Sequence, residues 1–112
     1  MDALSNPDLN VVLHQPVRTR IVAYIAARGE ATFNELKQEL DVTDGNLDSH
    51  MKKLVNAGYI EIRKIAAKKG KPKTLYNLTE LGNYEFEVYI ETLKRLLSPQ
   101  FRTLPDGVDK IQ

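Results

Sequence analysis

Residues 43–60 read TDGNLDSHMKKLVNAGYI and predict a helix with an unusual first turn. Apolar residues recur at helical spacing from Leu47 to Leu54, which indicates one buried face. The Asp-Gly-Asn run of residues 44–46 favours helix poorly, because a glycine inside a helix costs about 1 kcal/mol relative to alanine. A threonine can cap the start of this helix, and an Ala-Gly pair can end it. The sequence therefore predicts a helix over 44–57. The residues of its first turn do not favour helix stability, so another role must explain them.

The segment before this stretch completes a helix-turn-helix pattern. A Thr-Phe-Asn-Glu capping box at 32–35 predicts a helix over 33–40, and residues 41–43 form the turn between the two helices. An earlier helix is expected to end at Gly29, because glycine is the common residue just past a helix end. Three core helices are therefore expected before residue 58.

The N-terminal segment predicts a short helix of its own. The Asn-Pro-Asp run at 6–8 offers an N-cap, a proline in the first helical position and an acid in the first turn. Leu9, Val12 and Leu13 would form its apolar stripe. Pro16 then either kinks the chain or opens the next helix.

The region after residue 58 predicts a β-hairpin with a strongly basic tip. Residues 59–63 and 74–78 have the composition and alternation of short strands, with a Lys-Gly-Lys-Pro turn between them. Segment 63–73 holds six lysines and arginines and no acid, and because the whole chain is at +1, this leaves −5 for the rest. Such a cluster is typical of a nucleic-acid contact, although a lysine-rich loop can also be only solvated or can protect strand edges.

Four stretches carry a resemblance to a known family. They are HQPVRTRIVAYIAARG, ATFNELKQELDVTDGNLDSHMKKLVNAGYI, the basic hairpin and LYNLTELG, which together cover most of residues 14–82. The chain resembles winged helix-turn-helix transcriptional regulators of the ArsR/MarR type. A Ser-Pro pair at 98–99 is expected to stop the last helix, and Pro105 with the Asp-Gly pair at 106–107 predicts an irregular tail over 99–112. The resemblance implies a mainly α fold with a β-hairpin wing over residues 1–98. It also implies a homodimer that binds double-stranded DNA, with helix 44–57 in the major groove and wing 63–73 on the backbone or minor groove.

Several side chains in these two elements have the chemistry for DNA contact. Asn46 can pair bidentately with adenine, and Ser49 and His50 can reach other base edges. Gly45 permits close approach of the backbone, and the free N–H groups at a helix start attract phosphate. Asp44 can accept from a cytosine amino group, yet acids and asparagines also stand near helix starts simply as caps. The expected DNA contacts are Thr43, Asp44, Gly45, Asn46, Ser49, His50, Lys52, Lys53, Arg63, Lys68, Lys69, Lys71 and Lys73.

The last predicted helix, over 80–97, has more apolar surface than one buried face requires. One apolar face runs from Phe86 to Leu97 and a second from Leu81 to Val88. One of these faces can pack on the chain's own first helices, and the other needs a cover, either another part of the chain or, as we expect, a second copy related by a two-fold axis. Such a dimer would place two recognition helices about 34 Å apart on a pseudo-palindromic operator. The expected dimer interface is Leu9, Val12, Leu13, Leu81, Tyr84, Val88, Tyr89, Leu93 and Leu96.

Other functional classes have little support in the sequence. The chain has no cysteine, and His14 and His50 lack ligand-spaced partners, so neither a metal site nor another cofactor is expected. No catalytic motif and no bilayer-length apolar run stand in the sequence, so we expect a cytoplasmic protein that is neither an enzyme nor a membrane protein. The main alternative is a winged helix that contacts protein or RNA. A small effector between the first and last helices, lined by Tyr24, Tyr84 and Tyr89, is a further possibility, although core packing explains these tyrosines equally well.

Overall fold

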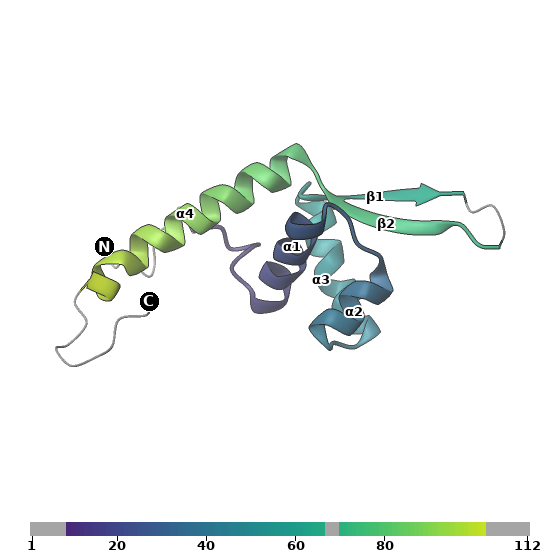
Figure 1. The fold of residues 1–112 in the computed structure, drawn as a ribbon, viewed down its shortest axis with the longest axis horizontal. Coiled ribbons are helices and arrows are strands. Elements are labelled where there is room, and N and C mark those ends of the chain that lie inside the picture. The colour runs from purple at the N-terminus through teal and green to yellow at the C-terminus, as the bar shows by residue number, and fades with distance from the viewer. Residues whose placement is uncertain (1–8, 67–69, 103–112) are drawn as a thin grey trace.

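The protein has a helical body from which a hairpin and a long helix extend in opposite directions (Figure 1). The computed structural model describes residues 9–66 and 70–102. In these residues, the two strands form one antiparallel sheet. The elements in chain order are α1 (Pro16–Arg28), α2 (Phe33–Leu40), α3 (Asp44–Asn56), β1 (Ile60–Ile65), β2 (Lys73–Leu78) and α4 (Glu80–Arg102).

The N-terminal segment does not form the short helix expected through Leu9, Val12 and Leu13, and this prediction is wrong. These residues form a turn that leads into α1. The side-chain oxygen of Asn10 accepts hydrogen bonds from the backbone N–H groups of Val12 at 2.9 Å and Leu13 at 3.1 Å. An asparagine side chain that satisfies these donors offers the backbone an alternative to a helix. The expected helix start at 6–8 lies outside the described residues.

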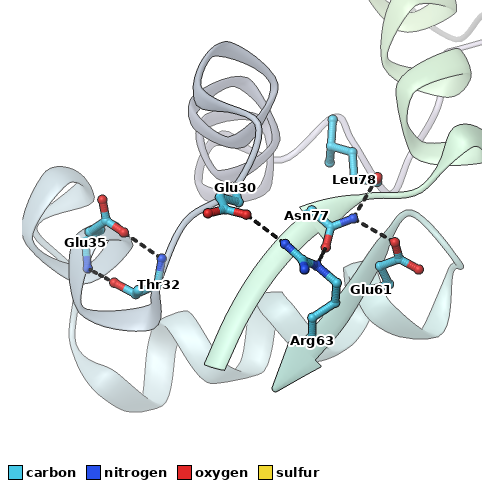
Figure 2. Close-up of polar contacts among 7 residues, drawn as sticks. All are labelled: Glu30, Thr32, Glu35, Glu61, Arg63, Asn77 and Leu78. Atoms are coloured by element: carbon cyan, nitrogen blue, oxygen red, sulfur yellow. Dashed lines mark hydrogen bonds and ion pairs between the residues drawn. The ribbon is translucent and has the colours of Figure 1, made fainter. Parts of the chain in front are cut away.

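Local capping signals determine where the first two helices begin and end. Pro16 opens α1 rather than kinking it, and the Gln15 side chain caps this helix. Gly29 ends α1 with φ at 90°, a conformation that glycine adopts without strain. At the start of α2, Thr32 donates its backbone N–H to Glu35 Oε1 at 2.8 Å, and the backbone N–H of Glu35 donates to Thr32 Oγ1 at 3.1 Å (Figure 2). The predicted capping box is therefore confirmed.

The core forms where α1, α2 and α3 meet the base of the hairpin. In the hairpin, Ile60 pairs with Leu78 and Ile65 with Lys73, while Ala31 forms a β-bridge to the outer edge of β2 at Tyr76. This bridge joins the loop before α2 to the hairpin and fixes the hairpin base against the body. The buried apolar side chains are Leu13, Ile21, Val22, Ile25, Ala31, Leu36, Leu40, Leu47, Met51, Leu54, Ile60, Leu75 and Tyr89.

The last helix passes close to the β1 entry and then extends beyond the body (Figure 1). A Cβ added at Gly82 would lie 2.1 Å from the carbonyl oxygen of Tyr59, so only glycine permits this approach. The helix was expected to stop at 98–99, but it continues through Pro99 to Arg102. A proline removes only one backbone donor, and here it does not end the helix. Residues 99–102 of the expected irregular tail are therefore helical, and 103–112 lie outside the described residues.

Candidate nucleic-acid interface

The outward side of α3 carries most of the residues assigned to DNA from the sequence. Burial of Leu47, Met51 and Leu54 against the core turns the opposite side of α3 to solvent. Thr43 caps the helix, because its side-chain oxygen accepts the backbone N–H of Asn46 at 3.2 Å. The residues on this side are called the outer face of α3, and all of them are exposed except His50, which is half-buried. They are Asp44, Gly45, Asn46, Asp48, Ser49, His50, Lys52 and Lys53.

Both acids on the outer face of α3 are paired with lysines. Asp44 Oδ1 lies 2.8 Å from Lys37 Nζ, and Asp48 Oδ2 lies 3.1 Å from Lys52 Nζ. These pairs offset the two negative charges that would otherwise oppose a phosphate backbone. Lys52, which the sequence assigns to phosphate contact, is therefore shared with an acid of its own helix.

Asn46 and Ser49 differ from the acids because their side chains are not engaged within the described part of the chain. Gly45 is similarly unconstrained, since a Cβ added there would meet no atom within 4 Å. The fold itself thus requires neither the amide, nor the hydroxyl, nor the glycine at these positions. All three lie on one exposed face of the described chain, where they are open to solvent.

His50 is connected to the body through a contact that the sequence did not indicate. Arg18 Nη1, on α1, lies 3.1 Å from His50 Nδ1. Burial lowers the pKa of His50, and the positive charges of Arg18 and Lys53 lower this pKa further. The neutral form of His50 is therefore favoured more than in a free imidazole, and one ring nitrogen is directed at Arg18.

Arg63 lies in the middle of β1, in a polar network with the body (Figure 2). Its Nη2 donates to Glu30 Oε1 at 2.7 Å, and its Nε donates to Asn77 Oδ1 at 3.1 Å. The Asn77 amide in turn donates to Glu61 Oε1 at 2.7 Å. The sequence assigns Arg63 to DNA, but in the folded chain its guanidinium ties β1 to β2 and to the loop before α2.

The outer part of the hairpin carries exposed cations. Lys64, Lys71 and Lys73 are all exposed. Lys68 and Lys69, which the sequence also assigns to DNA, lie outside the described residues. Closer to α3, burial raises the pKa of the Tyr76 hydroxyl, and the charge of Asp48 raises it further.

The two apolar faces of α4 have different surroundings. Tyr89 is buried in the core of the same chain, with Phe86, Ile90 and Leu93 partly buried beside it. Leu81 and Tyr84, on the second face, are 48% and 62% exposed. Of the expected interface, Leu13 and Tyr89 are therefore core residues of one chain, which corrects their assignment as free interface positions. Leu9, Val12, Val88, Leu93 and Leu96 are partly buried.

The structure does not bring together the three tyrosines expected around an effector. Tyr89 lines a cleft of about 370 Å³ with His14, whereas Tyr24 lines a different one with Glu39. Tyr84 is exposed on α4.

Across the described residues, no helix is long and apolar enough to cross a membrane. In the same residues, no group of three His, Cys, Asp or Glu side chains could hold a metal ion.

Comparisons with known proteins agree with this geometry. The family model for the winged helix DNA-binding domain matches residues 17–97. The chain belongs to this winged helix DNA-binding domain family. An uncharacterized protein of Methanocaldococcus jannaschii is 36% identical over 85 residues, which cover 76% of this chain and 91% of that protein.

Solved structures of the same winged-helix architecture include transcriptional regulators. A transcriptional regulator homologue from Pyrococcus horikoshii OT3 is 30% identical, covers 89% of this chain and 98% of its own, and superposes with a TM-score of 0.79. The transcriptional repressor BigR from Xylella fastidiosa, at 23% identity, shares the fold with a TM-score of 0.57 over 75% of this chain and 79% of its own. The predicted resemblance to winged helix-turn-helix regulators of the ArsR/MarR type is confirmed.

Within this winged helix, sequence reasoning missed the residues that act across long separations. Arg18 reaches His50, Glu30 reaches Arg63, and Gly82 permits the approach to Tyr59. The only sequence signal for Gly82 is its place two residues after the start of a helix, where glycine has no capping role. No periodicity or spacing marks the other two contacts, because each joins residues more than thirty positions apart.

Proposed function

We propose that this protein is a sequence-specific transcriptional regulator that binds double-stranded DNA as a homodimer. In this proposal α3 enters the major groove, and the basic wing of residues 63–73 contacts the backbone or the minor groove. One observation carries the proposal. The outer face of α3 presents Gly45, Asn46 and Ser49, none of which the fold requires, beside acids that are already paired with lysines.

The chemistry of this face suits base edges and phosphates. An asparagine amide can donate to N7 and accept from N6 of adenine, and a serine hydroxyl can act in either role. Free backbone N–H groups in the first turn of α3 can bind a phosphate oxygen, and Gly45 leaves room for that approach. Lys53, exposed one turn beyond Ser49, can neutralise a flanking phosphate.

The wing supplies the second contact in this proposal. Lys64, Lys71 and Lys73 are exposed on a hairpin that the Arg63 network holds to the body. A hairpin held to the body in this way can keep these cations on the same side as α3. Such cations favour any duplex sequence, because phosphate contacts carry affinity and register rather than base identity.

Dimer formation is the third part of the proposal. Leu81 and Tyr84 are exposed together on one side of α4, with Val88 partly buried one turn further on. A two-fold axis through this face would cover these side chains with their own copies. The two α3 helices could then bind half-sites about one DNA turn apart. Sedimentation velocity at micromolar concentration tests this part, and a monomer would contradict it.

A gel-shift series tests the class of partner. Equal lengths of duplex DNA, duplex RNA and single-stranded DNA are titrated with the wild-type chain and with Asn46→Ala. Asn83→Ala is the matched control, because Asn83 is exposed on α4 rather than on α3. We expect preferential retention of duplex DNA, weakened by Asn46→Ala and not by the control. Preference for RNA, or no retention of nucleic acid, would contradict the proposal and favour the RNA or protein-binding alternative.

A further inference from the structure

Arg18 is hydrogen-bonded through both its backbone and its side chain at the junction between the N-terminal turn and α1. Its backbone N–H donates to Gln15 Oε1 at 2.9 Å, and its Nε donates to the carbonyl oxygen of Val12 at 2.6 Å. The guanidinium is half-buried and planar, so its remaining N–H groups have fixed directions. One of them points at His50 Nδ1, at a distance of 3.1 Å.

This contact determines which nitrogen of His50 carries the proton. A guanidinium has five donors and no acceptor, and it does not deprotonate in proteins. His50 Nδ1 must therefore accept the hydrogen bond, and a neutral imidazole then carries its hydrogen on Nε2. The two ring nitrogens point to different sides of the ring, so Nε2 is directed away from Arg18.

We infer that Arg18 is a positioning residue for base recognition, which fixes His50 as the Nε2–H tautomer and so makes it a donor toward the major groove. This inference rests on the proposed function, because it requires α3 to lie in that groove. The neighbours of His50 on the outer face of α3 lack this property. An asparagine amide and a serine hydroxyl can each donate or accept, whereas a tautomer held by Arg18 can only donate from its outer nitrogen.

A fixed donor discriminates between bases in a defined direction. In the major groove guanine presents O6 where adenine presents an amino group, and thymine presents O4 where cytosine presents an amino group. A donor at this position favours the keto base of either pair and opposes the amino base. The wild-type chain should therefore prefer G over A, or T over C, at the base contacted by His50. Without Arg18, His50 could change tautomer and accept from the amino base, and one hydrogen bond gained there should reduce this preference about fivefold.

The tautomer itself can be measured without DNA. Long-range proton–nitrogen NMR on the histidine-labelled full chain distinguishes a protonated from an unprotonated ring nitrogen, and His50→Gln assigns the signals. We expect a single Nε2–H form for His50 at pH 7.5 and tautomeric averaging in Arg18→Met. Arg20→Met is the charge-matched control, since Arg20 lines clefts beside Tyr89 and Glu39 instead, and should leave the signals unchanged. An Nδ1–H form in the wild type, or no change in Arg18→Met, would overturn the inference.

Selection of bound duplexes from a random pool tests the consequence. The base whose preference changes in His50→Gln marks the contact. At that base we expect a keto preference in the wild type and in Arg20→Met, and a preference about fivefold smaller in Arg18→Met. If duplex DNA is still bound, a preference for the amino base at that position would overturn the inference. The same base preference in Arg18→Met as in the wild type would also overturn it. Absence of any selected duplex would overturn the proposed function and this inference with it, whatever the NMR result.

Discussion

Replacing Gly45 with alanine should separate what the fold needs from what the proposed partner needs. Gly45 is the second residue of α3 and does not have a positive φ. A Cβ built there meets no atom within 4 Å. Alanine removes conformational freedom from the unfolded chain without adding strain, which stabilises a helix by about 0.4–1 kcal/mol. Because the site is in the first turn, we expect about 0.5 kcal/mol and a rise in Tm of roughly 2–4 °C.

The same substitution should weaken DNA binding. If the first turn of α3 approaches the duplex through its backbone, the added methyl group separates a backbone donor from its phosphate or base partner. Loss of one hydrogen bond to a charged group costs about 1.5–3 kcal/mol, so we expect affinity to fall by roughly tenfold or more. Fluorescence anisotropy on a selected duplex measures affinity, and thermal unfolding at one protein concentration measures stability.

Gly82 offers a control with the opposite expectation. It is also a helical glycine, but its added Cβ would lie 2.1 Å from the backbone oxygen of Tyr59. Overpacking of this kind costs about 1–3 kcal/mol, so Gly82→Ala should lower Tm. A lower Tm for Gly45→Ala would contradict the conclusion that the fold has room for a methyl group at position 45. Unchanged affinity in Gly45→Ala would refute the close approach of α3 to DNA.

Three further predictions concern the wing, His50 and α4. Replacing Lys68, Lys69 and Lys71 with alanine should weaken binding to all duplex sequences and reduce the slope of log K against log salt by up to about 2.7, since each phosphate contact contributes about 0.9. Below pH 6.5 the unfolded chain binds more protons at His50 than the folded chain does, because the folded pKa is lowered. The free energy of unfolding should thus fall as pH drops through this window, less so in His50→Gln, as measured by urea titration at pH 7.5 and 5.5. Tyr84→Glu should produce monomers in sedimentation velocity at micromolar concentration, because a charge would be buried at the proposed interface.

Each of these predictions has a contradicting result. An unchanged salt slope would exclude the wing as a phosphate contact. Equal pH dependence of wild type and His50→Gln would show that other groups control stability in this window. Asn83→Glu adds the same charge to α4 at a different exposed position. Dissociation by this control as well as by Tyr84→Glu would mean that charge on α4, rather than the second apolar face, determines assembly.

The sequence predicted the helix-turn-helix and hairpin because their signals are local. The capping box at Thr32 and the apolar period of α3 are read within a few residues, and both are confirmed. The outer face of α3 follows directly from that period, since a helix that buries one side exposes the other. The hairpin followed from alternation and turn residues, and only its exact ends differ from those expected.

The remaining features depend on distances that no local pattern encodes. The turn at Asn10 replaced a helix because one side chain satisfied two backbone donors. Arg63 has the charge of a phosphate contact, yet Glu30, far away in sequence, pairs with it. Tyr84 and Tyr89 have the same side chain, but the turn before α1 buries only Tyr89. The Tyr89 hydroxyl oxygen lies 2.9 Å from His14 Nδ1. The sequence shows whether each of these residues is polar, charged or apolar, but it does not show which residue each one contacts in the fold.

The most direct measurement of the central proposal is a comparison of duplex sequence preference between the wild type and Asn46→Ala. Relative affinities are measured over a complete set of single-base variants of a selected site. We predict that Asn46→Ala abolishes the preference at one base pair in each of two half-sites and leaves the other positions and the salt slope unchanged. Preferences that are uniformly retained, or weakened equally at every position, would contradict base recognition by the outer face of α3.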